Sequence, residues 1–201
     1  MRPSALKKGC RTVAGKKIGV LALQGAFIEH LHAFERCGAE CSQVRSAKEI
    51  EEVDGLVIPG GESTTIGRLL REYNLGSVVI GNAEQGMPIW GTCAGMILLA
   101  KDIADSDQYR LGFMDIRVKR NAYGRQVDSF ESELEIAGLG QARGVFIRAP
   151  YVESVWNDAK ILCTYQDRIV MVEQGQYLAT AFHPELTNSL DIHQYFLSKV
   201  G

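Results

Sequence analysis

The sequence has no long hydrophobic run, little net charge and few prolines. No segment approaches the ~18 consecutive apolar residues that span a bilayer, and the apolar run 18–23 lacks the small-residue pattern of a signal-peptide cleavage site. We therefore expect neither membrane insertion nor secretion. The formal net charge of −2 gives no overall basic field, so nucleic acid is not an indicated partner.

Cysteine is also scarce, and its five copies are scattered at positions 10, 37, 41, 93 and 163. An odd, scattered set fits reduced thiols in the cytoplasm better than a disulfide framework. Cys37 and Cys41 have a ligand-like spacing, but no second cysteine or histidine pair completes four ligands. We expect no metal site and no cofactor.

The length of 201 residues and the hydrophobic content of 46% suffice for one substantial core. No repeat, low-complexity tract or proline-rich linker divides the chain, so we expect a single domain over residues 17–201. Residues 1–17 contain six Lys or Arg and no acidic residue. Because residues 1–16 have no apolar stretch of their own, we expect a poorly ordered extension or a remnant of an expression vector.

The first half of the chain repeats a pattern of short apolar strand, glycine turn and helix. Strands are expected over 17–23, 41–44, 55–58 and 87–90, with helices after the turns that follow the first, third and fourth. Residues 75–86 show no clear amphipathic pattern, and the helix after residue 93 is expected to fade near 102–107. This pattern predicts an α/β fold with a mostly parallel sheet, whose sites gather beyond the carboxyl ends of the strands.

The second half changes to strand candidates, and a helix returns only near residues 189–200. The strands are expected over 114–119, 134–136, 144–148, 160–164, 169–173 and 177–182, with a hairpin turn at Gln174-Gly175. We interpret these strands as an antiparallel extension of the same domain.

The helix expected over 26–37 carries Phe27, Leu31 and Phe34 at helical spacing, which predicts its buried face. His30 and His32 lie two residues apart on this helix and so point away from each other. We expect both to be solvated, without a metal.

The stretch Ile89 to Ala100 centres on a Gly-x-Cys-x-Gly turn between a strand and a helix. Glycines on both sides of Cys93 permit a sharp backbone and leave room for a substrate carbonyl above the sulfur. The helix N-terminus favours a reactive thiolate. Taken alone, the turn fits a catalytic cysteine and an ordinary buried cysteine equally well.

His183-Pro184-Glu185 follows the last expected strand. A thiol nucleophile needs a base, and the base needs an acceptor that fixes its tautomer. Because proline fixes φ, His183 and Glu185 can bend toward each other as they could not on a helix. The alternative for this tripeptide alone is a capped strand end.

Pro59-Gly60-Gly61 is a glycine turn at a strand end, where backbone N–H groups become available. Attack on a carboxamide creates an oxyanion that such donors stabilise, and we assign the donors to Gly61 and Ala94. The competing interpretation is a tight turn in which Ser63 or Thr64 caps the next helix.

Taken together, these residues resemble the triad-type (class I) glutamine amidotransferases, marked by the Gly-x-Cys-x-Gly turn and a later His-Pro-Glu. Within that group the chain is similar to the family of glutaminase subunits of pyridoxal 5′-phosphate synthases, through Gly-Gly-Glu-Ser-Thr and through Arg-Gln-Val-Asp-Ser-Phe-Glu within 120–131. The resemblance covers roughly residues 17–201 and implies the three-layer sandwich of that fold. It implies glutamine binding by Gly61, Glu62, Ser63, Arg120, Ile147 and Arg148.

The resemblance also implies the reaction and the partner. Cys93, His183 and Glu185 would form a triad that hydrolyses L-glutamine to L-glutamate and ammonia through a glutamyl thioester. The ammonia would pass to a barrel-type synthase subunit within a large hetero-oligomer. A stand-alone cysteine hydrolase or esterase and a catalytically silent subunit are the alternatives. An esterase has no need of the arginine motif, and a silent relative would usually have lost a triad member.

Overall fold

The computed structural model describes residues 15–120 and 129–201, and twelve strands lie within those ranges. They are β1 (Lys17–Leu21), β2 (Glu40–Val44), β3 (Gly55–Ile58), β4 (Ile89–Thr92), β5 (Ala100–Ile103), β6 (Met114–Lys119), β7 (Ser129–Ile136), β8 (Gly140–Ile147), β9 (Tyr151–Val155), β10 (Lys160–Tyr165), β11 (Arg168–Gln174) and β12 (Tyr177–Thr180). Ten of them form one sheet, and β7 and β8 form a separate antiparallel ribbon.

The large sheet has a parallel half and a mostly antiparallel half. The strand order is β2-β1-β3-β4-β12-β11-β9-β6-β5, with β10 paired to β11. The pairs from β2 to β12 are parallel, whereas β12, β11, β9 and β6 pair antiparallel in turn. β3 and β4 are buried along their whole length, as expected for parallel strands covered on both faces. The expected α/β fold with an antiparallel extension is confirmed.

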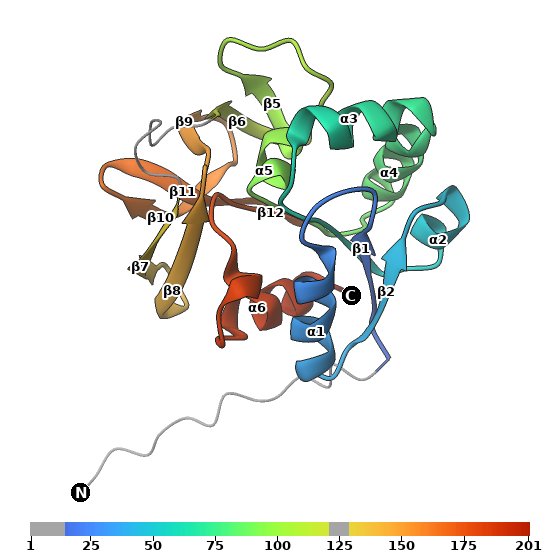
Figure 1. Cartoon of the computed structure of the whole chain (residues 1–201), viewed down its shortest axis with the longest axis horizontal. Coiled ribbons are helices and arrows are strands. Elements are labelled where there is room, and N and C mark those ends of the chain that lie inside the picture. Colours follow the sequence, from blue (N-terminus) through green and yellow to red (C-terminus); the bar gives the residue numbers. More distant parts are fainter. Residues whose placement is uncertain (1–14, 121–128) are drawn as a thin grey trace, which may run out of the picture.

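Helices cover both faces of the sheet. They are α1 (Phe27–Arg36), α2 (Ala47–Glu51), α3 (Ser63–Glu72), α4 (Leu75–Glu84), α5 (Ala94–Leu99), the 3₁₀ helix η1 (Pro184–Leu186) and α6 (Asp191–Lys199). Figure 1 shows α1 and α6 side by side on one face, with α3, α4 and α5 on the other. The aromatic side chains of Phe34, Trp90 and Phe196 pack between α1, α6 and β4. The carboxyl end of β4 therefore lies inside a three-layer core.

Several elements differ from the expectation, and β7 and β8 begin earlier than expected. Residues 75–84 form a helix, because Leu75, Val79 and Ala83 recur at helical spacing and are buried. The helix after Cys93 ends at Leu99 rather than fading near 102–107, because the following residues pair with β6 as β5. β9 was not predicted at all. For β5 and β9, pairing with β6 outweighs a weak local pattern.

The N-terminal extension lies largely outside the described residues, which begin at Gly15. Lys16, expected within the extension, is part of the described chain, and its Nζ donates hydrogen bonds to the carbonyl oxygens of Leu197 and Val200 at 3.0 and 2.6 Å. The end of α6 thus holds the residue before β1. The division of the chain at residue 17 stays a prediction.

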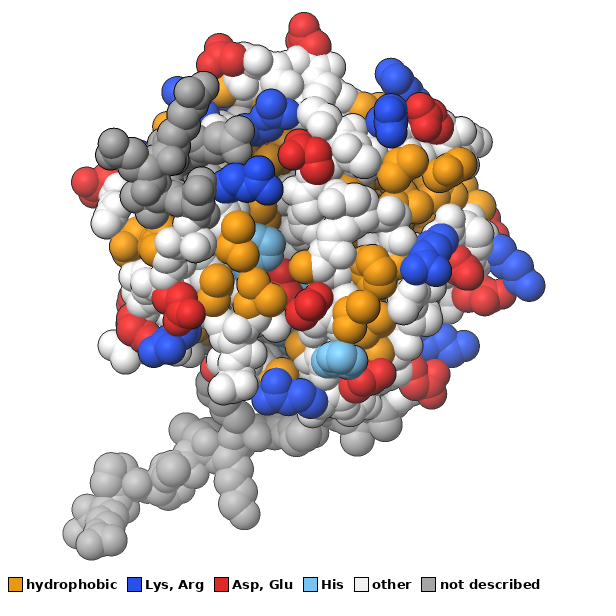
Figure 2. Space-filling model, viewed as in Figure 1, with side chains coloured by type: hydrophobic (Ala, Val, Ile, Leu, Met, Phe, Trp, Pro, Cys, Tyr) orange, Lys and Arg blue, Asp and Glu red, His pale blue; other side chains and the backbone are white. Residues whose placement is uncertain are grey.

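The described helices include none long and apolar enough to cross a membrane. Figure 2 shows Lys and Arg side chains interspersed with Asp and Glu on the face in view. Neither sign of charge dominates that face.

Candidate active site

Cys93 lies between the end of β4 and the start of α5, and its backbone is strained. Its φ of 48° and ψ of −99° are unusual for a residue with a Cβ. The Cys93 N–H donates to the carbonyl oxygen of Thr180 at 2.7 Å, which ties the turn to the end of β12. Cys93 is 8% exposed. Neighbouring strand ends hold the cysteine in a conformation that it would otherwise leave.

The two glycines of the turn are required by close packing. A Cβ at Gly91 would collide with the backbone of Gly95, and a Cβ at Gly95 would collide with the carbonyl oxygen of Ile58. Neither glycine has a positive φ, whereas Cys93 does. The unusual backbone conformation therefore lies at Cys93 itself, and the glycines let α5 approach β3 and β4.

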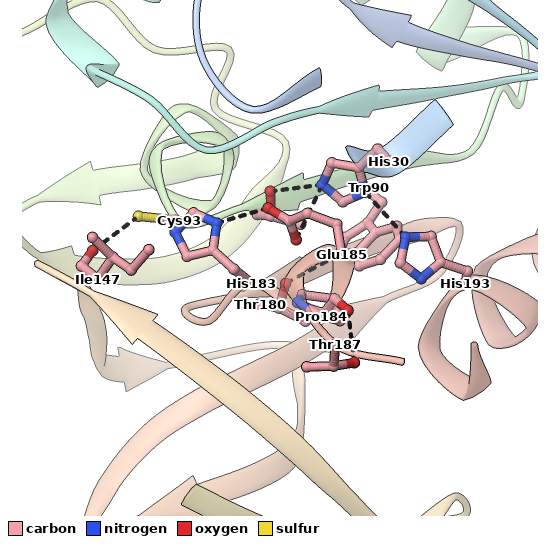
Figure 3. Close-up of polar contacts among 11 residues, drawn as sticks. His30, Trp90, Cys93, Ile147, Thr180, His183, Pro184, Glu185, Thr187 and His193 are labelled. Atoms are coloured by element: carbon pink, nitrogen blue, oxygen red, sulfur yellow. Dashed lines mark hydrogen bonds and ion pairs between the residues drawn. The ribbon is translucent and has the colours of Figure 1, made fainter. Parts of the chain in front are cut away.

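His183 and Glu185 bend toward each other as expected (Figure 3). His183 Nδ1 donates to Glu185 Oε1 at 2.7 Å, and both residues are buried. The His183 N–H donates to the carbonyl oxygen of Val145, which links this segment to β8. With Nδ1 engaged by the carboxylate, Nε2 is the ring nitrogen left for the sulfur.

The surroundings of His183 favour its protonated form. Burial lowers the pKa of His183, but contacts with Cys93 and Glu185 outweigh burial and raise this pKa to about 10. Burial raises the pKa of Glu185, and the nearby His30 and His183 more than offset it, so its pKa lies below the ordinary value. Glu185 therefore stays ionised and stabilises a proton on His183.

A pocket of about 510 Å³, including the space open to solvent, lies above the cysteine. Its lining contains every residue that the resemblance implies for glutamine binding, together with both expected oxyanion donors. The lining residues are Gly61, Glu62, Ser63, Cys93, Ala94, Ile97, Arg120, Ile147 and Arg148. Residues from four separate stretches of the chain thus meet around one sulfur, and Ile97 is the only member that was not predicted.

Hydrogen bonds connect the Gly60-Gly61 turn to the turn after β1. The Ala26 N–H donates to the carbonyl oxygen of Gly60 at 3.0 Å, and the Glu62 N–H donates to Gln24 Oε1 at 2.7 Å. A Cβ at Gly60 would press on the imidazole ring of His183. The capping alternative for Ser63 and Thr64 is not seen, since Glu62 is the N-cap and no side chain caps α3.

Gln108 forms hydrogen bonds with two of the predicted glutamine-binding residues. The sequence analysis did not predict it. Its Oε1 accepts hydrogen bonds from Ser63 Oγ, at 3.2 Å, and from Arg120 Nη1. Its buried Nε2 has no hydrogen-bond partner within the described chain. No local pattern singles out this glutamine, because it lies in an irregular segment between β5 and β6.

The carboxyl end of β8 forms another part of the pocket lining. Arg148 is exposed and has a φ of 42°, and the preceding Ile147 is 37% exposed. The Ile147 carbonyl oxygen lies 3.9 Å from Cys93 Sγ. Most of the arginine motif over 120–131, residues 121–128, lies outside the described residues.

The expectation that His30 is solvated is wrong. His30 is fully buried, with its Nε2 3.4 Å from Glu185 Oε2, whereas His32 is exposed. Position 30 extends the apolar face of Phe27, Leu31 and Phe34, so the helical spacing itself could have located it.

His193 of α6 lies against His30 and was also missed. Outside residues 1–14 and 121–128, no group of three or more His, Cys, Asp or Glu side chains could hold a metal ion.

Residues 20–201 match the model of the SNO glutamine amidotransferase family. The chain is 57% identical over 187 residues to pyridoxal 5′-phosphate synthase subunit PdxT of Moorella thermoacetica, covering 92% of this chain and 100% of the relative. It is 56% identical over 185 residues to the subunit of the same name from Desulforamulus reducens, covering 91% and 98%.

Solved structures agree on the fold. A crystal structure described as a glutamine amidotransferase superposes with a TM-score of 0.88 at 48% identity, over 92% of this chain and 98% of the other. PurLQS from Thermotoga maritima, at 16% identity, has a TM-score of 0.67 over 92% and 99% of the two chains, which shows the fold alone. On the family match and these identities, the chain belongs to the SNO glutamine amidotransferase family.

Proposed function

We propose that this chain is the glutaminase subunit of a pyridoxal 5′-phosphate synthase, in which Cys93 is the nucleophile, His183 its base and Glu185 the partner of His183. The observation that carries the proposal is the position of the Cys93 thiol, with His183 beside it and a pocket containing two arginines above it. The names of the PdxT relatives support the assignment to this synthase.

The pocket suits the two ends of glutamine. Arg120 and Arg148 offer cations for an α-carboxylate, and Glu62 and Ser63 offer oxygen acceptors for an α-amino group. The side-chain carboxamide then reaches the sulfur at the bottom of the pocket. The N–H groups of Gly61 and Ala94 are the proposed donors to its oxygen.

Hydrolysis proceeds in two halves. The Cys93 thiolate attacks the carboxamide carbon, a C–S bond forms, and His183 protonates the nitrogen as the C–N bond breaks and ammonia leaves. Water then attacks the glutamyl thioester while His183 accepts a proton from the water. The C–S bond breaks, glutamate leaves, and the thiolate and imidazolium are restored.

The ammonia is consumed by a partner. Free ammonia is mostly protonated at neutral pH and is then not nucleophilic, so the product is best passed directly to a synthase subunit in a complex. We propose, on the family resemblance, a barrel-type partner and a large hetero-oligomer. The same proposal places the chain in the cytoplasm, where a free thiol such as Cys93 stays reduced.

The test is glutamate release from L-glutamine by the wild type and by Cys93→Ala, each with and without the partner synthase subunit. We expect wild-type hydrolysis in the complex and its loss in the variant. Glutaminase activity that survives Cys93→Ala would exclude the mechanism. Hydrolysis of simple esters but never of glutamine would favour the stand-alone esterase.

A further inference from the structure

The carboxylate of Glu185 has two oxygens, and His183 engages only one of them. Oε1 accepts from His183 Nδ1 at 2.7 Å, whereas Oε2 has no regular hydrogen bond within the described chain. His30 Nε2 faces Oε2 at 3.4 Å from the opposite side (Figure 3). A buried carboxylate oxygen needs a donor, and His30 is the residue placed to supply it.

His193 determines which nitrogen of His30 carries the proton. His193 Nε2 lies 3.1 Å from His30 Nδ1, and His193 Nδ1 has no partner among residues 15–120 and 129–201. Burial lowers the pKa of both histidines, to about 2 for His193, so both rings are neutral. Of its two nitrogens, only Nε2 of His193 has an acceptor for its hydrogen, which is His30 Nδ1, so the hydrogen of His30 lies on Nε2. That nitrogen lies 3.2 Å from Thr92 Oγ1 and 3.4 Å from Glu185 Oε2, so its hydrogen is shared between the hydroxyl and the carboxylate.

The ring of His30 is also fixed sterically. It packs edge-on against Trp90 with ring centroids 5.2 Å apart, and its Nε2 lies 3.2 Å from Thr92 Oγ1. Thr92 is the last residue of β4 and directly precedes Cys93. α1, α6 and β4 therefore hold His30 in one orientation relative to both Glu185 and the nucleophile.

We propose that His30 is a positioning residue for glutamine hydrolysis, holding the second oxygen of Glu185 so that the first stays aligned on His183, while His193 sets the tautomer of His30. This inference rests on the proposed function, because it gives Glu185 its role in the reaction. The series of contacts from Cys93 through His183 to Glu185 thus continues to His30 and His193, which touch no substrate.

The main experiment is a double-variant cycle on the complex with the synthase subunit. We expect His30→Leu, which keeps the bulk and removes the donor, to lower kcat about tenfold or more with KM within about twofold. In a Glu185→Gln background the same change is expected to alter kcat less than about twofold. An equal loss of kcat in both backgrounds would overturn the proposal.

A second pair of variants keeps the test valid if His30→Leu does not fold. His30→Gln places an amide nitrogen near the position of Nε2 and is expected to retain most of kcat. His30→Asn reaches only the position of Nδ1 and is expected to lose kcat as His30→Leu does. Similar kcat for the two amides would contradict the proposal, and His32→Leu on the exposed side of the same helix is the matched control.

The pH profile supplies a readout that packing alone would not move. The titratable groups that face His30 are Glu185 of η1, His183 directly before η1, His193 from α6 and Glu29 from its own helix. Because the N–H of neutral His30 faces the Glu185 carboxylate at 3.4 Å and favours its anion, the acid limb of kcat should move to higher pH in His30→Leu. An acid limb at the same pH in His30→Leu and in the wild type would contradict the proposal.

These experiments can refute the role of His30 while leaving the proposed function intact. Wild-type glutaminase that Cys93→Ala and Glu185→Gln abolish but His30→Leu leaves intact would refute only the role of His30. A Glu185→Gln variant as active as the wild type would instead refute the proposed role of Glu185.

Discussion

The two sides of the pocket are built differently. The reacting side, made of Cys93, His183, Glu185 and His30, is at most 8% exposed and is held by β4, β12 and α1. Each of its rings or carboxylates touches another member of the set.

The binding side consists of Glu62, Ser63, Arg120, Ile147 and Arg148. Glu62, Ile147 and Arg148 are exposed, with Ile147 at 37%, and Arg120 is half-buried; only Ser63 of this set is buried. The two sides therefore differ in function. The core of the sheet positions the atoms that react, so changes there should lower kcat, whereas changes at the rim should raise KM.

Glu185→Gln is expected to have the largest effect. The amide cannot balance a charged His183, so kcat should fall about 10²- to 10⁴-fold with KM little changed. Steady-state glutamate release by the complex measures both constants. Glu52→Gln, at a glutamate whose side chain is 60% exposed, is the control. A variant with normal kcat would remove the distinction between the two sides.

Gly60→Ala tests how tightly the reacting side is packed. The added methyl group would meet the ring of His183, and displacing that ring should lower kcat by up to about 10²-fold. The free energy of unfolding should fall by about 1–3 kcal/mol, as for other overpacked sites. Gly81→Ala in α4 has open space around the added carbon and should be neutral or stabilising. Normal kcat in Gly60→Ala would show that His183 tolerates displacement.

Arg120→Lys tests the binding side. Lysine cannot reproduce the fork of the guanidinium, which lies against Gln108 and faces the pocket. We expect KM for glutamine to rise about tenfold while kcat changes less. Arg143→Lys, at an exposed arginine paired with Glu131 and Glu133, is the matched control. A fall in kcat at unchanged KM would assign Arg120 to the reacting side.

The smallest expected effect is on the pH dependence of the free energy of unfolding. His183 has a folded pKa of about 10 against an ordinary 6.5, so its contribution is complete below pH 6.5 and is lost as the pH rises toward 10. His193 has a folded pKa of about 2, so its contribution is present above pH 6.5 and is lost as the pH falls.

Urea unfolding between pH 5 and pH 10, a range of about five units around the ordinary histidine pKa, measures these slopes. His183→Gln should flatten the alkaline decline and His193→Phe the acid decline. A profile that neither variant changes would mean that these histidines do not titrate differently in the folded state.

Much of the site could be predicted from local sequence. His183 and Glu185 are two residues apart with proline between them, and Cys93 lies between two glycines, so short-range geometry determines both arrangements. The predicted binding residues do line the pocket, although their roles stay predictions. Gln108 was missed because it lies in an irregular segment that no local pattern marks. The contact between His30 and Glu185 could not be predicted because the two residues lie far apart in the sequence.

The sequence by itself determined the strand-turn-helix units, the nucleophile turn and the family to which the chain belongs, since these depend on residues within a few positions of one another. Only the tertiary structure decided that β12 pairs with β4, placing Thr180 beside Thr92 and hence His183 beside Cys93. It also brought together His30 and His193, which are 163 residues apart. Contacts of that kind arise from the packing of whole elements against the sheet, which no local pattern of residues encodes.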